Sequence, residues 1–132
     1  MTATLNRILC IDDEEDILQV ARLSLEMVGG FEVHQCRGSG AALAEARRVR
    51  PDLILLDVMM PEMDGPTTLG KVREDASLAH VPVIFMTAKA QPSELGQLLA
   101  TGAIGVISKP FDPMALPDQI KSLWKKHHES QS

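Results

Sequence analysis

The chain has 132 residues, of which 45% are hydrophobic and 23% charged, a balance that is typical of a folded domain and excludes extensive disorder. Its 13 basic and 18 acidic residues give a formal net charge of -5, which argues against direct binding of nucleic acid. No apolar stretch approaches the roughly 20 residues that a membrane-spanning helix needs, so we expect no membrane insertion.

Short β-type runs alternate along the chain with longer stretches of helical period. This alternation predicts a parallel sheet that is covered by helices on both faces. The predicted strands are Arg7 to Ile11, Glu32 to Cys36, Leu53 to Leu56, Val83 to Met86 and Gly105 to Ser108.

The first predicted helix runs from about Glu15 to Met27 and is ended by Gly29 and Gly30. Its buried face is expected to consist of apolar residues at helical spacing, namely Ile17, Val20, Ala21, Leu25 and Val28.

The second predicted helix spans Ala41 to Arg48, with Ser39 as a cap for its free N–H groups, and it ends before Pro51. We interpret its basic residues as a solvated face: Arg47, Arg48 and Arg50.

Prolines are expected to open the next two helices. The third helix is predicted from Pro66 to about Glu74, and the fourth from Pro92 and Ser93 to Gly102.

The last helix is predicted to start near Asp112 and Pro113 and to bury one apolar face, made by Leu116, Ile120, Leu123 and Trp124. Pro117 has no N–H to donate toward Pro113, which leaves two alternatives: an irregular first turn, or a regular helix that begins later. A polar tail is expected from Lys125 to Ser132.

Two cysteines, Cys10 and Cys36, lie inside apolar runs that are predicted strands, so we expect reduced, structural thiols. The N-terminal stretch Met1 to Ile11 leads directly into two aspartates, unlike the cleavage region of a signal peptide. Both features favour a cytoplasmic protein.

Acidic side chains follow two of the predicted strands. Asp12 and Asp13 come after the first strand, and Asp57 ends the third. Because the carboxyl ends of parallel strands meet at one edge of a sheet, these carboxylates are expected to form one cluster. Crowded carboxylates are either partly protonated or hold a cation, and oxygen ligands beside an incoming phosphate suit Mg²⁺.

Two further polar residues end the remaining strands, Thr87 the fourth and Lys109 the fifth. A hydroxyl and an ammonium group both donate to phosphate oxygens, so we expect both side chains to face the acidic cluster. Asp57 is the candidate nucleophile of this site.

Each of these residues has an ordinary structural alternative. Asp13 alone could cap the first helix, Asp57 could be a solvated loop acid, and Thr87 could be a β-branched strand residue. The acid-rich run after the first strand, and the apolar run before Asp57, favour the site instead. The histidines show no ligand pattern and are not expected to bind metal: His34, His80, His127 and His128.

Four motifs in this order resemble those of response-regulator receiver domains of two-component signalling. They are Asp12-Asp13, the run from Asp57 through Met59-Met60-Pro61 to Asp64-Gly65, Met86-Thr87-Ala88, and Lys109-Pro110-Phe111. The resemblance implies an α/β, flavodoxin-like fold, a three-layer αβα sandwich of (βα)5 topology whose parallel five-stranded sheet has the order 2-1-3-4-5. It also implies a receiver domain over residues 5–126 and a polar tail over 127–132.

By this resemblance, a sensor histidine kinase or a phosphotransfer protein passes a phosphoryl group to Asp57. Asp12, Asp13, Asp57 and the backbone carbonyl of Met59 would hold Mg²⁺, Lys109 would contact the acyl phosphate, and Thr87 would close over a phosphate oxygen. The Lys109–Pro110 bond is expected to be cis. A receiver of this kind is a switch and not an enzyme, apart from self-catalysed phosphotransfer and autodephosphorylation. As a stand-alone domain it would act through a partner protein whose identity the sequence does not give.

Three positions bear on how this switch would behave. Val106 stands where receivers usually carry an aromatic residue, so the ring rotation that often reports phosphorylation cannot occur in its usual form. Met59 and Lys89 lie two residues after Asp57 and Thr87, respectively, and are expected to tune phosphate lifetime.

Other functions fit the sequence less well. A Mg²⁺-dependent phosphatase of the haloacid-dehalogenase type has a second acid where Met59 stands, and a flavodoxin would place its phosphate where Asp12 to Asp16 repel it. A receiver-like binding module without phosphate turnover stays open as the main alternative.

Overall fold

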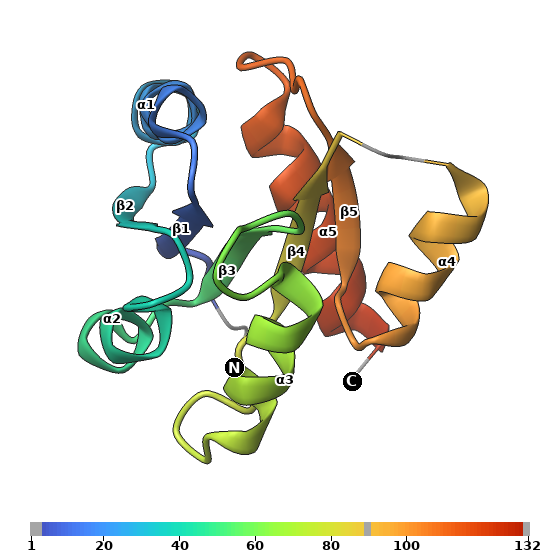
Figure 1. Ribbon diagram of the computed structural model, residues 1–132. Coiled ribbons are helices and arrows are strands. Elements are labelled where there is room, and N and C mark those ends of the chain that lie inside the picture. The colour runs from blue at the N-terminus through green and yellow to red at the C-terminus, as the bar shows by residue number, and fades with distance from the viewer. Residues whose placement is uncertain (1–3, 89–90, 131–132) are drawn as a thin grey trace.

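Parallel β-strands that pair with one another form the centre of the protein in the computed structural model, which describes residues 4–88 and 91–130. The strands are β1 (Arg7–Asp12), β2 (Glu32–Arg37), β3 (Leu53–Asp57), β4 (Val83–Thr87) and β5 (Gly105–Ser108). They form a five-stranded sheet with the order β2-β1-β3-β4-β5, in which every neighbouring pair is parallel (Figure 1). The predicted strands and their order are confirmed.

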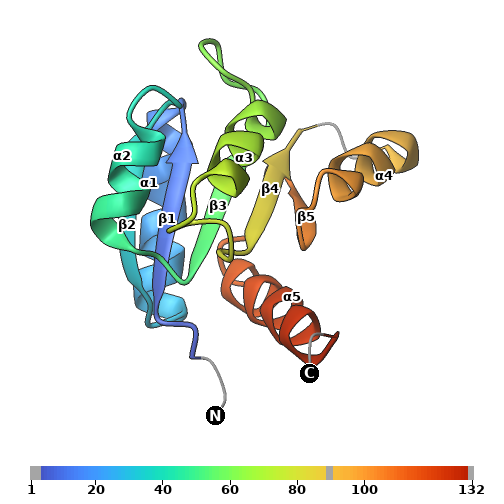
Figure 2. The same cartoon turned by 90° about the horizontal axis from the view of Figure 1, so that it is seen from below.

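Helices cover the two faces of this sheet (Figure 2). They are α1 (Glu15–Leu23), the π-helical turn η1 (Ser24–Val28), α2 (Ala42–Val49), α3 (Gly65–Glu74), α4 (Pro92–Ala100) and α5 (Leu116–Ser130). One core cluster joins the sheet to α1, η1 and α5, and a second joins it to α2, α3 and α4. The arrangement is the expected three-layer sandwich.

The central strands β3 and β4 are buried along their whole length. A strand that is covered on both faces has no side chain that reaches water, which explains why Leu53 to Leu56 form an unbroken apolar run. The first polar residue of β3 is Asp57, where the strand reaches the edge of the sheet. At Asp57, therefore, the chain passes from apolar core residues to a polar residue at the edge of the sheet.

The first helix differs from the prediction in its second half, where α1 continues as the π-helical turn η1. Val20 and Val28, expected on the buried face, are 40% and 45% exposed, whereas Leu18 and Ser24 are buried. A π turn holds more residues than an α turn and so rotates the side chains that follow it. This accounts for Val28, which lies in the π turn; Val20 precedes the turn and is exposed because the buried face of α1 is made by Leu18 and Ala21 instead.

Helix α2 begins at Ala42, and Ala41 is the residue before its first turn, with no side-chain cap. The prediction that Ser39 caps this helix was wrong. Its hydroxyl is buried and has no hydrogen-bond partner among the described residues, and only its backbone carbonyl accepts, from the amide of Ala42 at 3.2 Å.

Helix α5 begins at Leu116 and continues through Ser130. Pro117 therefore lies in the first turn, where a missing N–H breaks no helical hydrogen bond, so the second alternative is the correct one. The residues from Lys125 to Ser130, expected to be a tail, continue the helix, and the rings of Trp124 and His128 lie 4.0 Å apart.

Both cysteines are buried and unpaired with each other, as expected. Burial raises the pKa of the Cys10 thiol to about 12, so this group stays protonated and unreactive. Within the described ranges, no helix has the length and apolar character needed to cross a membrane.

Gly65, the first residue of α3, lies directly against the end of β3. A Cβ atom there would lie 2.6 Å from the backbone oxygen of Asp57 and 2.9 Å from the Cα of Val58. Because backbone atoms cannot move aside cheaply, Gly65→Ala is expected to lower the free energy of unfolding by about 1–3 kcal/mol.

Gly70, on the same helix, provides the control because a Cβ atom there meets nothing within 4 Å. Gly70→Ala is expected to raise the free energy of unfolding by about 0.5–1 kcal/mol. Urea denaturation measures both effects, and equal stability of the two variants would contradict the close approach of α3 to β3.

Candidate functional site

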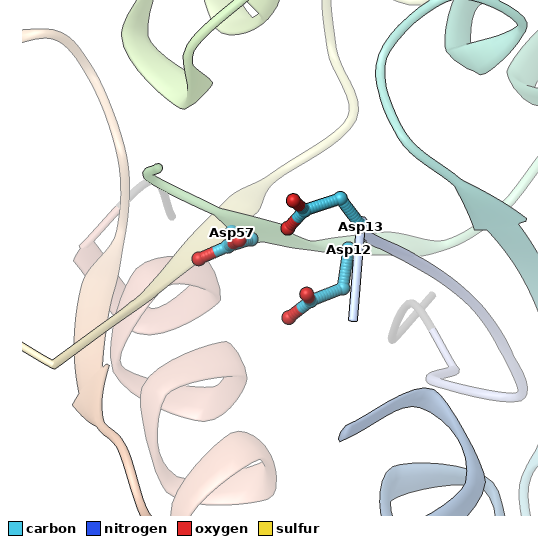
Figure 3. A group of neighbouring side chains, drawn as sticks. All are labelled: Asp12, Asp13 and Asp57. Carbon is cyan, nitrogen blue, oxygen red and sulfur yellow. The ribbon is translucent and has the colours of Figure 1, made fainter. Parts of the chain in front are cut away.

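Three carboxylates meet at the carboxyl edge of the sheet. Asp12 ends β1 and Asp57 ends β3, and these strands are neighbours whose register pairs Ile11 with Leu56. Asp13 follows β1 directly, and one oxygen from each carboxylate lies within 4.8 Å of the others. Figure 3 shows the three side chains as neighbours, with those of Asp12 and Asp13 extending toward the side on which Asp57 lies. The predicted acidic cluster is therefore present.

Lys109 contributes the positive charge of this cluster. Its Nζ lies 2.8 Å from Oδ2 of Asp12 and donates a hydrogen bond of 2.9 Å to Oδ1 of Asp57. The side chain is only 10% exposed, and the carboxylates of Asp12 and Asp57 are 0% and 4% exposed. Such buried charges are tolerated because they are paired.

Backbone contacts hold Lys109 at the edge of the sheet where the acidic cluster lies. Its amide donates to the carbonyl oxygen of Thr87 at 2.8 Å, which joins the end of β5 to the end of β4. The Lys109–Pro110 peptide bond is cis, as the resemblance implied.

The pKa of Asp57 is raised from 3.8 to about 6. Burial is the main cause, since it disfavours the charged carboxylate; the hydrogen bond from Lys109 opposes it, and the negative charge of Asp12 adds to it. Burial alone would lower the pKa of Lys109, yet its contacts with Asp12 and Asp57 raise it above the ordinary value. At neutral pH the site therefore holds a charged lysine beside mostly ionised Asp57.

The loop after β3 is held close to the acidic cluster. The amide of Val58 donates to Met86 at 3.0 Å, and the amide of Gly65 donates to Val58 at 2.8 Å. Asp64 caps α3 by accepting from the amide of Thr67 at 2.9 Å. These contacts hold the backbone of the loop that contains Met59. Met59 itself is 61% exposed.

Thr87 ends β4 and is 3% exposed, and it lines a groove together with Met59, Pro66 and Leu98. The structure thus brings Asp12, Asp13, Asp57 and Lys109 into one cluster and places Thr87 on the adjoining strand. Lys89 lies outside the described residues. Val106 is half-buried and pairs with Phe85 in the sheet.

The ion pair between Lys109 and Asp12 is the feature of the site that sequence reasoning missed. The available signal was the position of both residues at the ends of strands on the same sheet edge. Three carboxylates against one ammonium leave an excess of negative charge, and all their ligand atoms are oxygen. This donor set fits Mg²⁺, a hard cation that prefers carboxylate oxygens.

The raised pKa of Asp57 has a consequence for stability. The folded protein binds the Asp57 proton more tightly than the unfolded chain does, because the pKa is about 6 when folded and near 3.8 otherwise. Ionisation therefore costs the folded state free energy, and stability is lost as the pH rises from about 4 to about 6. In metal-free protein, Asp57→Asn is expected to raise the free energy of unfolding by about 2–3 kcal/mol at about pH 7, and by far less at about pH 4.

Urea denaturation in a chelating buffer at these two pH values tests this expectation. Glu62→Gln, a change at an exposed carboxyl group of the loop after β3, is the control and should alter stability by less than about 0.5 kcal/mol. Equal stabilisation by Asp57→Asn at both pH values would show that ionisation of Asp57 is not the cause.

Comparisons with known proteins agree with this geometry. A family model described as the response regulator receiver domain matches residues 8–121. The chain is 35% identical over 120 residues to the DNA-binding dual master transcriptional regulator RpaA of Synechocystis, a match that covers 91% of this chain and 49% of that protein. It is 40% identical over 119 residues to Response regulator PleD of Caulobacter vibrioides, covering 89% of this chain and 26% of that protein.

Among solved structures, the chemotaxis response regulator CheY4 of Vibrio cholerae is similar with a TM-score of 0.83 and 31% identity, over 91% of this chain and 99% of that one. The chain spans about half of the first of the two curated relatives and about a quarter of the second. The match to the family model extends from β1 into α5 and includes the whole acidic cluster. The chain therefore belongs to the receiver-domain family of two-component response regulators.

Proposed function

We propose that this protein is a phosphorylation switch in which Asp57 accepts a phosphoryl group from a phosphohistidine of a sensor histidine kinase or phosphotransfer protein. The observation that carries this proposal is the buried carboxylate of Asp57, which lies in contact with Lys109 beside two further aspartates. A nucleophile, a positive charge and a cluster of metal-binding oxygens are the components that phosphoryl transfer requires.

The proposed metal ligands are the carboxylates of Asp12, Asp13 and Asp57 and the backbone carbonyl of Met59. Their support is the convergence of the three carboxylates and the fixed backbone of the loop after β3. Bound Mg²⁺ would supply positive charge that neutralises the oxygens of the transferring phosphoryl group.

In the proposed transfer, an ionised oxygen of Asp57 attacks the phosphorus atom as the bond from phosphorus to the donor histidine nitrogen breaks. The electron pair of that bond leaves with the histidine ring, and Asp57 becomes an acyl phosphate. Its pKa of about 6 leaves Asp57 mostly ionised at neutral pH, which keeps the nucleophile available.

Lys109 and Thr87 are proposed to bind the oxygens of the acyl phosphate. The ammonium of Lys109 already lies 2.9 Å from Asp57, so it can donate to a group attached there without a large movement. Thr87 is proposed to donate its hydroxyl to a phosphate oxygen, because it ends the strand next to β3. The chain would then act as a switch with only self-catalysed transfer and autodephosphorylation, and not as an enzyme that acts on other molecules.

Two alternatives receive less support. An aspartyl-phosphate phosphatase of the haloacid-dehalogenase type uses a second acid two residues after its nucleophile, and this chain has Met59 there. A receiver-like module without turnover would have the same fold, but its function would not depend on the paired charges of Asp57 and Lys109.

We further propose that the switch occupies residues 5–126, works in the cytoplasm and signals through a partner protein rather than by binding nucleic acid itself.

Phosphorylation by a small donor tests the proposed acceptor. With acetyl phosphate and Mg²⁺, the protein is expected to gain the mass of one phosphoryl group, because the site itself supplies the nucleophile and the compensating charge. Intact-mass spectrometry measures the gain. Asp57→Asn is expected to abolish it, while Asp118→Asn, at an exposed position on α5, should leave it unchanged. Undiminished labelling of Asp57→Asn would remove this residue as the acceptor.

Binding of Mg²⁺ alone tests the proposed ligands. Asp13→Ala is expected to weaken binding by about tenfold or more, since it deletes one of few charged ligands. Asp16→Ala removes an acid from the nearby first turn of α1, outside the cluster, and should change affinity by less than about twofold. Calorimetry or amide chemical shifts provide the measurement, and equal affinities of the two variants would argue against Asp13 as a ligand.

A further inference from the structure

A buried serine joins the first helical segment to the loop that contains Lys109. Ser24 lies in η1 and is 2% exposed. Its hydroxyl donates a hydrogen bond of 2.5 Å to the backbone carbonyl of Pro113, a residue that stands 89 positions later in the chain. A buried hydroxyl without a partner would destabilise the fold, so this hydrogen bond accounts for the presence of a polar residue in the core.

The π-helical turn explains how a serine reaches this loop. The amide of Gly29 donates to the carbonyl of Ser24 at 3.1 Å, a bond to the fifth residue back rather than to the fourth. Ser24 and Leu25 are both buried, so the turn directs a polar and an apolar side chain into the core. Leu25 packs in one core cluster with Leu116 and Ile120 of α5. The apolar side chain thus contacts the core around α5, and the hydroxyl bonds to the segment just before that helix.

The turn that contains Pro113 is held together by hydrogen bonds of its own. The side chain of Asp112 accepts the amide of Met114 at 2.9 Å, and its backbone carbonyl accepts two further amides at 3.0 and 2.9 Å. Residues 112–116 therefore form one hydrogen-bonded unit that leads into α5. The hydroxyl of Ser24 attaches this unit to η1.

Lys109 stands only four residues before Pro113, at the other end of the same loop. Its amide donates to the carbonyl of Thr87 at 2.8 Å, which holds that end of the loop to β4. Its ammonium has to reach both Asp12 and Asp57, at 2.8 and 2.9 Å. Loss of the attachment to η1 would leave the loop held by the sheet alone, and the start of this side chain would be free to move.

The helical segment that holds this loop also begins beside the acidic cluster. Helix α1 starts two residues after Asp13 and continues directly into η1. One continuous segment therefore follows the aspartates at one end and holds the loop of Lys109 at the other. Such precision matters for the reaction, because a displacement of about 1 Å at a reacting group can lower a rate by about 100-fold.

We propose that Ser24 is a positioning residue for Lys109: its hydrogen bond holds the loop after β5 against η1, and so keeps the ammonium where it can bind the transferred phosphoryl group. The inference rests on the proposed function, since it concerns the same site. Ser24 acts only through the loop and takes no part in the reaction itself. The alternative is a hydroxyl that serves stability alone, and variants separate the two roles.

Ser24→Ala removes the hydroxyl and introduces a residue that favours helix. With acetyl phosphate and saturating Mg²⁺, this variant is expected to gain phosphate about tenfold more slowly than the unmodified protein, because Lys109 is no longer held in place. Its affinity for Mg²⁺, measured by calorimetry without phosphodonor, should change by less than about threefold, since the three carboxylates do not lie on this loop. A purely structural hydroxyl would lower the melting temperature when removed and leave the rate unchanged.

Thr68→Val is the matched control. Thr68 is also a buried hydroxyl that donates to a backbone carbonyl, that of Asp64 at 2.9 Å, but this bond lies at the start of its own helix. The variant should change the labelling rate by less than about twofold. Hydrogen exchange at the amide of Lys109 is a second readout, which needs no phosphoryl transfer. Exchange should become faster in Ser24→Ala and stay unchanged in Thr68→Val.

The possible outcomes separate this inference from the proposed function. An unchanged labelling rate in Ser24→Ala would overturn the inference, as would an equal loss of Mg²⁺ affinity or unchanged exchange at Lys109. Absence of labelling in the unmodified protein would contradict the proposed function instead. Exchange at Lys109 would then still decide whether Ser24 holds the loop.

Discussion

The ammonium of Lys109, held between the carboxylates of Asp12 and Asp57, is the interaction on which the rest of the site depends. It joins the ends of three strands that are far apart in sequence but lie at one edge of the sheet. Without it, two nearly fully buried carboxylates would face each other, and one would have to take up a proton. The sheet brings these groups together, and the lysine makes their proximity tolerable at neutral pH.

This pairing also links stability to function. Burial raises the pKa of Asp57, and Lys109 limits the rise, so the carboxylate is ionised at neutral pH while the folded state carries a free-energy cost. Active sites commonly retain such costs because the same group must later react. Gly65 is a second residue that the geometry of the site requires, since its missing side chain lets α3 start against the backbone of Asp57. The buried apolar residues of the strands stabilise the fold and offset the free-energy cost of ionised Asp57.

Much of this could be predicted from the sequence, because the strands are short apolar runs with polar residues at their ends. Asp12, Asp57, Thr87 and Lys109 follow such runs, and parallel pairing brings the ends together. Helix details were harder to predict. The π turn in the first helix and the failure of Ser39 to cap α2 depend on how the helices pack, which local periodicity does not encode.

The central claim is that the buried carboxylate of Asp57 forms an acyl phosphate. The most direct measurement is the phosphorus resonance of protein incubated with a small phosphodonor and Mg²⁺, followed by addition of hydroxylamine. An acyl phosphate has a chemical shift distinct from that of a phosphate ester, and hydroxylamine attacks its carbonyl carbon and releases inorganic phosphate. We predict a single such resonance that hydroxylamine removes. A resonance that survives hydroxylamine, or the absence of any protein-bound phosphorus, would contradict the account.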